Sequence, residues 1–339
     1  MQARLLTDPI APTLLKLSAP NIVAMSIMLA TSMAEAFYVG QLGVVPLAGL
    51  ALAFPMIMLT LMMAGGSFGG AIAGAVAQRL GAGDRDAAES VALHSLLMTM
   101  GFAALFSLLF LLFGRQFYTA LGGQGEVLEQ ALHYSNVFFA GCAAIWVANG
   151  ANAIIRGTGQ MNIAGGAMAI GSLIQIFVSA LLVLGIGPFP TLGIAGAAVG
   201  NIVGFSIASL LQLWFLVRLS EPLRLPLRGT TLKMSVFLDV FKQGSLASIS
   251  PLSSVFTVII ITAVMARLGA DILAGYGIGA RLEFLMTPLI FGIGSAAITM
   301  VGAHFGAGHY ARGVRIGWVS SLSAAGLAGF MGILLALFP

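Results

Sequence analysis

The sequence predicts an all-α membrane protein that crosses the bilayer many times, and three observations lead to this fold class. The chain has 339 residues, of which 59% are hydrophobic and 8% are charged, whereas a soluble chain carries about 25% charged residues. Its mean hydropathy is +1.03. The apolar residues also run the whole length of the chain, in blocks long enough for spanning helices, which need about 20 residues each. Lipid must therefore solvate most of this surface.

Nine apolar segments are predicted as spanning helices. They cover residues 14–39, 46–78, 89–114, 131–155, 163–187, 192–218, 237–266, 272–303 and 314–338. The composition changes after the sixth segment, where a polar stretch contains Arg218, Glu221, Pro222, Arg224, Pro226, Arg228 and Lys233. We therefore expect an N-terminal lobe of six helices (1–219), a cytoplasmic linker (220–236) and a partial C-terminal lobe of three helices (237–339).

The basic residues predict the orientation in the membrane. Only Arg115 and Arg267 fall at odd-numbered loops, and Arg281 lies inside a span. The other twelve lie at the N-terminus or in even-numbered loops: Arg4, Lys16, Arg79, Arg85, Arg156, Arg218, Arg224, Arg228, Lys233, Lys242, Arg312 and Arg315. Because short cytoplasmic loops are enriched in Lys and Arg, we expect a multi-pass protein of the cytoplasmic (inner) membrane with a cytoplasmic N-terminus. The same distribution argues against a nucleic-acid partner.

The chain also repeats itself. The run from Gln41 to Gly49 reappears from Arg267 to Gly275, and the two runs share the pattern Leu-Gly-x-x-x-Leu-Ala-Gly. The triplet Gly81-Ala82-Gly83 reappears at nearly the same offset as Gly306-Ala307-Gly308. Two similar bundles with a substrate path between them are the common architecture of secondary transporters.

Several short motifs follow one another along the chain. In order, they are Ser18-Ala19-Pro20; Glu35-Ala36-Phe37-Tyr38-Val39-Gly40 with Leu42-Gly43 and Leu47-Ala48; Pro55; Ala77-Gln78-Arg79-Leu80-Gly81-Ala82-Gly83-Asp84; Arg156-Gly157-x-Gly159; Gly185-Ile186-Gly187; and Leu192-Gly193-Ile194-Ala195-Gly196-Ala197-Ala198.

Taken together, these motifs resemble the MATE family, the multidrug and toxic compound extrusion transporters, over essentially the whole chain. Pro20 matches the proline that kinks the family's first helix. The resemblance implies two six-helix lobes around a cleft that opens to each side of the membrane in turn. It also implies a monomer that exports organic cations, drugs or other amphipathic compounds in exchange for protons or sodium. No cofactor or metal is expected besides this coupling ion.

The chain departs from the family pattern in two respects. A complete second repeat would extend to about residue 445, so we expect a C-terminal truncation, with nine helices of the family's twelve. The acidic positions also differ. One branch of the family carries Asn and Asp in helix 5, where this chain has Gln175 and Ser179, and another carries an acid in helix 7, where this chain has Ser254.

Glu35 is the leading candidate for coupling-ion binding. It lies in an apolar stretch from Ile22 to Val39 and has no other charged residue in the first span after Lys16. A carboxylate within the membrane is costly and commonly serves proton or ion traffic. Glu35 is therefore predicted as a proton switch or sodium site. The alternative is a wetted, idle carboxylate near the outer interface, because Gly40 lies only five residues further on.

Other polar residues lie within predicted spans. Glu283 is the second candidate for coupling-ion binding, and Arg281 has a gating or substrate role or pairs with another helix. The remaining candidates for the substrate cavity are Tyr38, Asn136, Asn149, Gln175, Ser179 and Ser254. For each of them the alternative is a hydrogen bond between helices, worth under about 1 kcal/mol.

Rival functions find less support in these residues. A flippase for lipid-linked sugars, from the same broad superfamily, would line its cleft with several basic residues, and the spans carry little beyond Arg281. A membrane enzyme needs a nucleophile or metal set with an acid or base partner, which the scattered polar residues do not form. No Gly-x-x-x-x-Gly-Lys-Ser/Thr motif for ATP is present. An inactive, shortened remnant is the third alternative.

Overall fold

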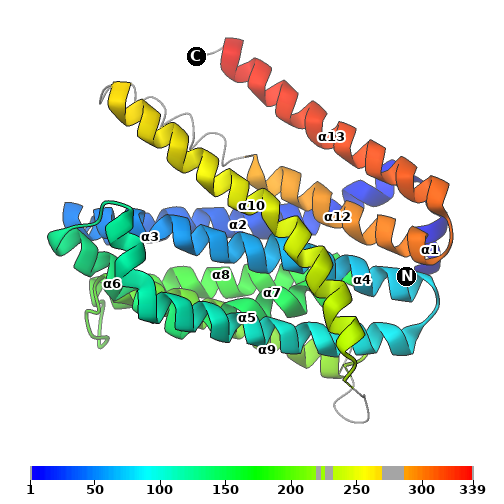
Figure 1. Ribbon diagram of the computed structural model, residues 1–339, viewed down its shortest axis with the longest axis horizontal. Helices are drawn as coiled ribbons and strands as arrows, with labels where there is room; N and C mark the ends of the chain where they lie inside the picture. Colours follow the sequence, from blue (N-terminus) through cyan, green and yellow to red (C-terminus); the bar gives the residue numbers. More distant parts are fainter. Residues whose placement is uncertain (1, 219–222, 226–231, 269–285, 338–339) are drawn as a thin grey trace.

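The computed structural model describes residues 2–218, 223–225, 232–268 and 286–337, and its regular structure in these ranges is entirely helical (Figure 1). The helices of the first part are α1 (Gln2–Thr7), α2 (Ile10–Gly40), α3 (Val44–Leu61), the π-helix η1 (Met62–Phe68), α4 (Gly69–Gly81), α5 (Arg85–Ala120), α6 (Gly125–Ala140), α7 (Cys142–Gly157), α8 (Met161–Leu184) and α9 (Ile194–Arg218). The second part contains α10 (Met234–Leu268), α12 (Thr287–Gly306) and α13 (Tyr310–Leu337).

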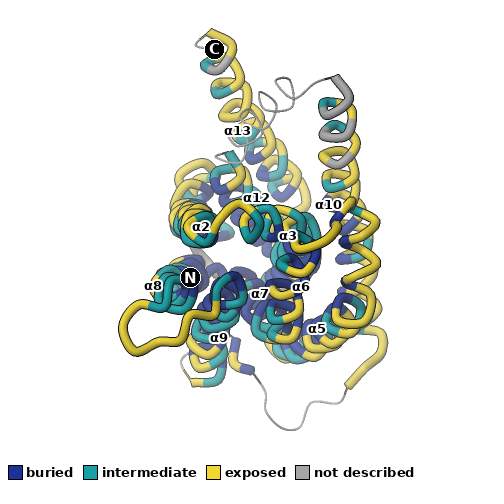
Figure 2. The backbone as a smooth tube through the Cα atoms, turned by 90° about the vertical axis from the view of Figure 1, so that its left-hand side faces the viewer, coloured by how far each residue is buried: buried dark blue, intermediate teal, exposed yellow. Residues whose placement is uncertain are grey.

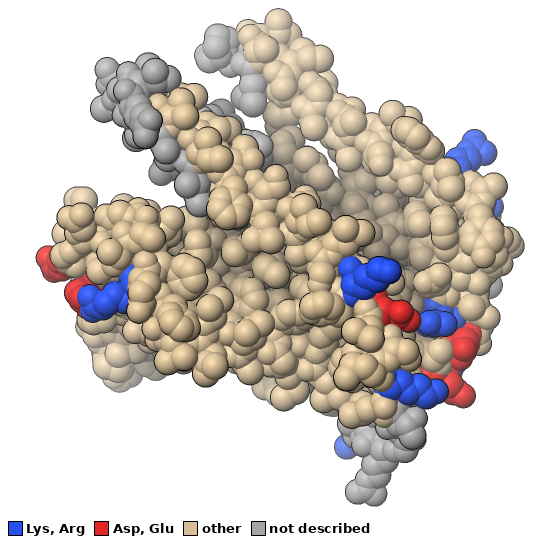
Figure 3. Space-filling model, viewed as in Figure 1, with Lys and Arg blue, Asp and Glu red and all other residues tan. Residues whose placement is uncertain are grey.

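The surface is that of a multi-pass membrane protein. Seven helices of the described ranges are long and apolar enough to cross a bilayer, and the bent pair α6–α7 makes an eighth span. Large apolar side chains within the spans face outward, such as Leu108, Phe177 and Trp214, which are 63%, 69% and 58% exposed. Charged side chains gather at the two ends of the molecule and leave an uncharged belt between them (Figure 3). The predicted fold class is therefore confirmed.

Most of the buried core lies among helices α2 to α9, and a smaller buried cluster joins α12 and α13 to α1, α2 and α8. Helices α10 and α13 are largely exposed, and α13 packs mainly on α12 (Figure 2). Helix α8 packs along α9 and α2. Aromatic rings fill the centre, where Phe102 stacks on Trp146 at 5.0 Å between ring centroids and Phe68 lies 4.3 Å from Phe102. The bundle that precedes the linker therefore has a core of its own.

The fourth predicted span, 131–155, was expected as one continuous helix, and that expectation is wrong. The chain forms α6 and α7, which meet at Gly141 with a bend of 53°. A Cβ atom at Gly141 would overlap the side chain of Ile202 on α9. The break therefore coincides with a glycine that a neighbouring helix approaches closely, which hydropathy does not reveal.

The second predicted span also has an irregular centre. Helices α3 and α4 are joined without a gap by η1, whose π-helical turn contains Gly65 and Gly66. A Cβ atom at Gly65 would lie 2.7 Å from the Asn149 side-chain oxygen. Short π-helical segments inside α-helices are common at functional positions.

The internal repeat is visible in the structure. Helices α4 and α12 end at Gly81 and Gly306, the first glycines of the two repeated triplets, and the helices that follow, α5 and α13, begin at matching positions. The turns between them contain Gly83 and Gly308, whose φ angles are 77° and 78°. This left-handed conformation is open to glycine at low cost, so the two repeats form the same turn with the same residue type.

The two repeats meet where α4 crosses α12. A Cβ atom at Gly302 would lie 2.8 Å from the Gly74 carbonyl oxygen, and one at Gly306 would overlap the Gln78 carbonyl. A Cβ atom at Gly81 would likewise overlap the carbonyl of the residue after Gly302. Small residues allow such close approach of helix backbones in membranes.

Part of the predicted linker is ordered against the bundle. Leu223 and Leu225 are buried, and the Leu225 N–H donates to the Leu216 carbonyl at 3.0 Å. The Lys233 N–H donates to Nε2 of the buried His94 at 2.9 Å. The predicted linker residues 220–222 and 226–231 lie outside the described residues. Helix α10 begins at Met234, within the range predicted for the linker.

Candidate functional site

Glu35 lies in the last two turns of α2, and its side chain points into the bundle. The residue is 8% exposed. Helix α2 buries one stripe of its surface, which includes Thr31, Glu35 and Val39. This spacing of four residues places all three on the same face of the helix. The sequence of α2 therefore aims Glu35 towards the neighbouring helices and away from lipid.

Two side chains from other helices bind Glu35. The hydroxyl of Tyr134 on α6 donates a hydrogen bond of 2.6 Å to Glu35 Oε1. The amide Nδ2 of Asn201 on α9 lies 3.0 and 3.1 Å from the two carboxylate oxygens, and 3.1 Å from the Tyr134 hydroxyl. Both residues are buried, at 2% and 7% exposure. Three helices thus converge on one carboxylate through polar groups that carry no charge.

No basic residue neutralises this carboxylate in the described part of the chain. The ion pairs there are Arg85–Glu89 and Arg115–Glu129, both at the surface. A buried carboxylate without a counter-ion is costly. It becomes neutral by taking up a proton, or it is balanced by a bound cation. The two carboxylate oxygens and the Tyr134 hydroxyl are oxygen ligands of the kind that hard cations prefer, whereas Asn201 turns its Nδ2 donor towards them.

Two predicted polar residues lie close to this cluster along the interface of α8 and α9. Ser179 is 1% exposed and packs against Gly200, the residue before Asn201. Gln175 is 7% exposed and packs one turn further along, against Gly204. A Cβ atom at either glycine would approach these side chains to 3.0 Å or less. Glycine in α9 therefore lets the polar face of α8 approach the Glu35 cluster.

Other predicted residues are placed elsewhere. Asn149 is buried at 9% and donates to the Ile145 carbonyl of its own helix at 2.8 Å. Tyr38 is half-buried against the core of the bundle. Asn136 is exposed on α6, and Ser254 is exposed on α10 and donates to a carbonyl of its own helix at 3.0 Å. None of these four contacts Glu35 through a hydrogen bond in the described structure.

Arg281 and Glu283 lie outside the described residues. Pro20 lies inside α2, which continues through it from Ile10 to Gly40. Its carbonyl oxygen faces Gly165 of α8, where a Cβ atom would approach to 2.7 Å. One residue further on, Asn21 donates to Ser295 Oγ of α12 at 2.6 Å. Pro20 therefore lies where α2 contacts both α8 and α12.

Tyr134 and Asn201, the two partners of Glu35, are not among the residues predicted from the sequence. Both lie in predicted spans, and each is a polar residue in an apolar segment. The residue predicted on α6 was Asn136. It is two residues from Tyr134 and therefore lies on a different face of the helix. Asn201 lies three residues after the Leu192–Ala198 motif that resembles the MATE family. Tyr134 and Asn201 can be identified as partners of Glu35 once it is known which faces of α6 and α9 meet α2.

A cavity of about 470 Å³ lies between α4, α10, α12 and α13, beside the α4–α12 crossing. Its polar side chains include Gln78 and Gln243. The predicted substrate residues that the structure describes do not line it. Within the described ranges, no group of three or more His, Cys, Asp or Glu side chains is placed to hold a metal ion.

This arrangement defines a class: a polytopic helical protein with an internal repeat and a buried carboxylate, as in ion-coupled transporters. The family model named MatE matches residues 20–181 and 247–339, and the chain belongs to this family. One matched segment lies in each copy of the sequence repeat.

The chain is similar to proteins named as transporters or multidrug resistance proteins over nearly all its length. It is 26% identical over 312 residues to the FAD transporter of Shewanella oneidensis, covering 91% of this chain and 68% of that protein. It is 25% identical to a probable multidrug resistance protein NorM of Thermotoga maritima, covering 96% of this chain and 70% of that protein. A MATE transporter solved in an outward-facing conformation superposes with a TM-score of 0.87 at 26% identity, covering 99% of this chain and 73% of that chain. This protein is therefore a MATE-type transporter.

Proposed function

We propose that the protein is an ion-coupled antiporter that exports organic cations, drugs or other amphipathic compounds by alternating access, and that Glu35 is its coupling site. The observation that carries this proposal is the burial of Glu35 among Tyr134 and Asn201 without a basic partner in the described structure. The family and its multidrug relatives support the transport function. The coupling ion is a proton or sodium, and the substrate leaves chemically unchanged.

The proposed cycle follows from the cost of an uncompensated charge. When the space beside Glu35 is wet, the ionised carboxylate binds a cation or attracts a cationic substrate. When the site is closed off from water, the carboxylate must be neutralised by a proton or sodium ion. Ion binding and substrate binding then exclude each other, which couples export to the ion gradient. Gln175 and Ser179 extend the polar surface towards the substrate.

We further propose the arrangement in the membrane. Residues 1–219 and 237–339 belong to two lobes joined by the linker 220–236. The N-terminus lies on the cytoplasmic side of the inner membrane, because the basic residues favour that side. In this orientation the close crossing of α4 and α12 seals the cytoplasmic end, and Glu35 is reached from the outside.

A second substrate class has support of its own. The Shewanella relative is named as an FAD transporter, and FAD is an anionic dinucleotide. Arg156 is 3% exposed and donates to the Gly65 carbonyl at 3.2 Å, with no carboxylate in ion-pair distance in the described structure. A buried arginine without an acidic partner can bind an anionic group of the substrate. Export of a flavin dinucleotide is therefore the alternative proposal.

The test is transport by the purified protein in proteoliposomes under an imposed proton or sodium gradient. A lipophilic organic cation and FAD are compared as substrates. Glu35→Gln should reduce gradient-driven transport by about 100-fold. It should also weaken binding of the organic cation, because the variant lacks the carboxylate charge that attracts this substrate.

The matched control is Glu126→Gln, which removes an exposed carboxylate from the first turn of α6. It should transport like the wild type. If Glu35→Gln accumulates substrate to the wild-type level under either gradient, Glu35 is not the coupling site. If FAD is transported and the organic cation is not, the anionic substrate class replaces the cationic one.

A further inference from the structure

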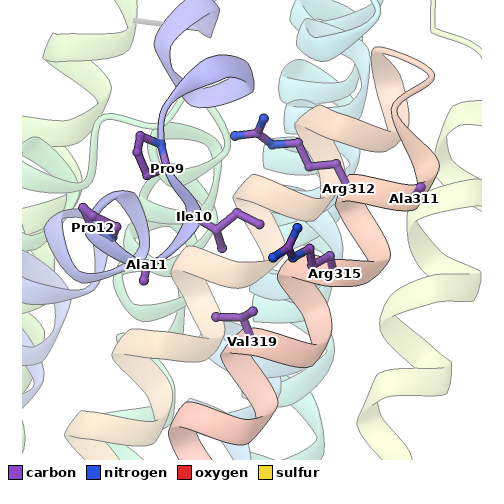
Figure 4. A pocket seen from close by; sticks show the side chains of 8 residues that line it. All are labelled: Pro9, Ile10, Ala11, Pro12, Ala311, Arg312, Arg315 and Val319. Atoms are coloured by element: carbon purple, nitrogen blue, oxygen red, sulfur yellow. The ribbon is translucent and has the colours of Figure 1, made fainter.

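A cavity of about 670 Å³ lies at the end of the molecule where α1 meets α2 and where α13 begins (Figure 4). It lies at the opposite end of α2 from Glu35 and is formed by residues of both repeats. Six of its lining residues matter here: Pro9, Ile10 and Pro12 from the start of α2, and Arg312, Arg315 and Val319 from α13. Both arginine side chains extend from α13 towards the α2 side of the cavity (Figure 4).

The two arginines carry positive charge that the described part of the protein does not balance. Arg312 donates through Nη2 to the carbonyl oxygens of Thr7 and Asp8, so its partners are backbone dipoles and not a carboxylate. Its Nε is buried without a hydrogen-bond partner. Arg315 is exposed and makes no ion pair within the described structure. The cavity therefore has two cationic groups and unused donors.

The rest of the cavity wall is apolar. Ile10 of α2 points towards the Arg315 guanidinium, and Val319 lies on α13 one turn beyond Arg315 (Figure 4). Beyond the cavity, α13 displays Val314 and Trp318 at 52% and 66% exposure. Exposed Trp and Tyr mark the interface between lipid and water in membrane proteins. The cavity thus combines a charged end with an apolar wall at the level of the lipid headgroups.

We propose that this cavity binds an anionic phospholipid. Arg312 and Arg315 hold the phosphate, because guanidinium groups form paired hydrogen bonds with phosphate oxygens. The first part of an acyl chain lies along Ile10 and Val319. Basic pockets between spanning helices on the cytoplasmic side suit such headgroups. A free phosphate ion would leave the apolar wall uncovered, so the wall favours a lipid. The proposal concerns lipid binding and does not depend on the coupling role of Glu35.

The experiment measures lipid binding by native mass spectrometry of the purified protein in detergent. Dioleoyl phosphatidylglycerol is titrated beside dioleoyl phosphatidylcholine, which has the same chains without net charge. The wild type should bind one phosphatidylglycerol about 30-fold more tightly than phosphatidylcholine, and Arg315→Gln should reduce this preference about fivefold. Arg315 makes no ion pair in the described structure, so the substitution leaves the fold intact. Arg312→Gln should weaken binding further, although it also removes the contact with Thr7 and Asp8.

The matched control is Arg218→Gln, which removes an exposed basic residue at the end of α9 outside the cavity. It should bind phosphatidylglycerol like the wild type. Equal binding of the two lipids by the wild type, or unchanged binding by Arg315→Gln, would overturn the proposal. If millimolar inorganic phosphate displaces phosphatidylglycerol completely, the cavity is a site for soluble anions and the lipid assignment is wrong.

Discussion

Helices α2 and α10 occupy matching places in the two repeats, yet they differ in chemistry. When Gln41 is aligned with Arg267, Glu35 of α2 corresponds to Ile261 of α10. Helix α2 buries its carboxylate against α6 and α9, whereas α10 displays large apolar side chains along its outer face. The two repeats place α2 and α10 in the same position, but the buried carboxylate of α2 is replaced by isoleucine in α10. The two repeats thus share their helix arrangement but differ in the polar residues that they bury.

The second comparison is between α4–α5 and α12–α13, where the copies agree. The helices end at Gly81 and Gly306, and the following turns contain Gly83 and Gly308 with nearly equal φ angles. Each helix end also approaches the backbone of the other copy too closely for a Cβ atom. The shared part of the repeat is therefore the part that brings the two copies together.

The largest predicted effect concerns this contact. Gly306→Ala and Gly81→Ala should each separate α4 from α12, at a cost of about 2–3 kcal/mol, because overpacking against a backbone carbonyl cannot be relieved by a side-chain rotation. Spin labels at Arg79→Cys and His309→Cys report the distance, and the buried Cys142 stays unlabelled. Both substitutions should shift the distance distribution to longer values.

The control for this contact is Gly294→Ala on the same helix, where a Cβ atom would meet nothing within 4 Å. Its distance distribution should match that of the wild type. If Gly306→Ala and Gly81→Ala leave the distribution unchanged, the crossing is not the seal between the two copies. Unequal shifts would show that the copies do not share the contact evenly.

A smaller effect is expected when a partner of Glu35 in the first repeat is changed. Tyr134→Phe removes the hydroxyl that donates to Glu35 at 2.6 Å. A hydrogen bond to a charged group contributes about 1.5 kcal/mol or more, so gradient-driven transport should fall about tenfold. Tyr118→Phe is the control, because this buried tyrosine of α5 makes none of the hydrogen bonds to Glu35. Equal losses in the two variants would mean that the effect is structural.

The smallest predicted effect tests the shared turn. Asp84 caps α5 by accepting a hydrogen bond of 2.9 Å from the Ala87 N–H. At the matching position of the second copy, His309 instead places its ring 6.3 Å from that of His304. Asp84→Ala should therefore destabilise the protein by about 1 kcal/mol, whereas His309→Ala should have little effect. The midpoint of unfolding in sodium dodecyl sulfate measures both, and equal shifts would contradict the capping role of Asp84.

The sequence predicted the parts of the structure that depend on composition and spacing. The apolar blocks predicted a multi-pass helical protein, the two glycine triplets predicted the repeat, and the apolar stretch around Glu35 predicted a charge within the membrane. Three features depended on contacts between distant residues and were missed. The bend at Gly141 depends on Ile202 of α9, and the partners of Glu35 depend on which faces of α6 and α9 meet α2. Hydropathy indicates that a segment lies in the membrane, but it does not indicate which face of the helix contacts its neighbours.

The most direct test of the central claim is an infrared difference spectrum of the purified protein, recorded between the substrate-bound and ion-bound states. If Glu35 exchanges its ion for substrate, the spectrum will contain carboxyl bands that disappear in Glu35→Gln and persist in Glu126→Gln. A loss of the protonated carboxyl band on substrate binding would identify the proton as the coupling ion, and a shift of the carboxylate bands with sodium would identify sodium. If Glu35→Gln gives the same carboxyl bands as the wild type, another residue performs the coupling and the account of Glu35 is wrong.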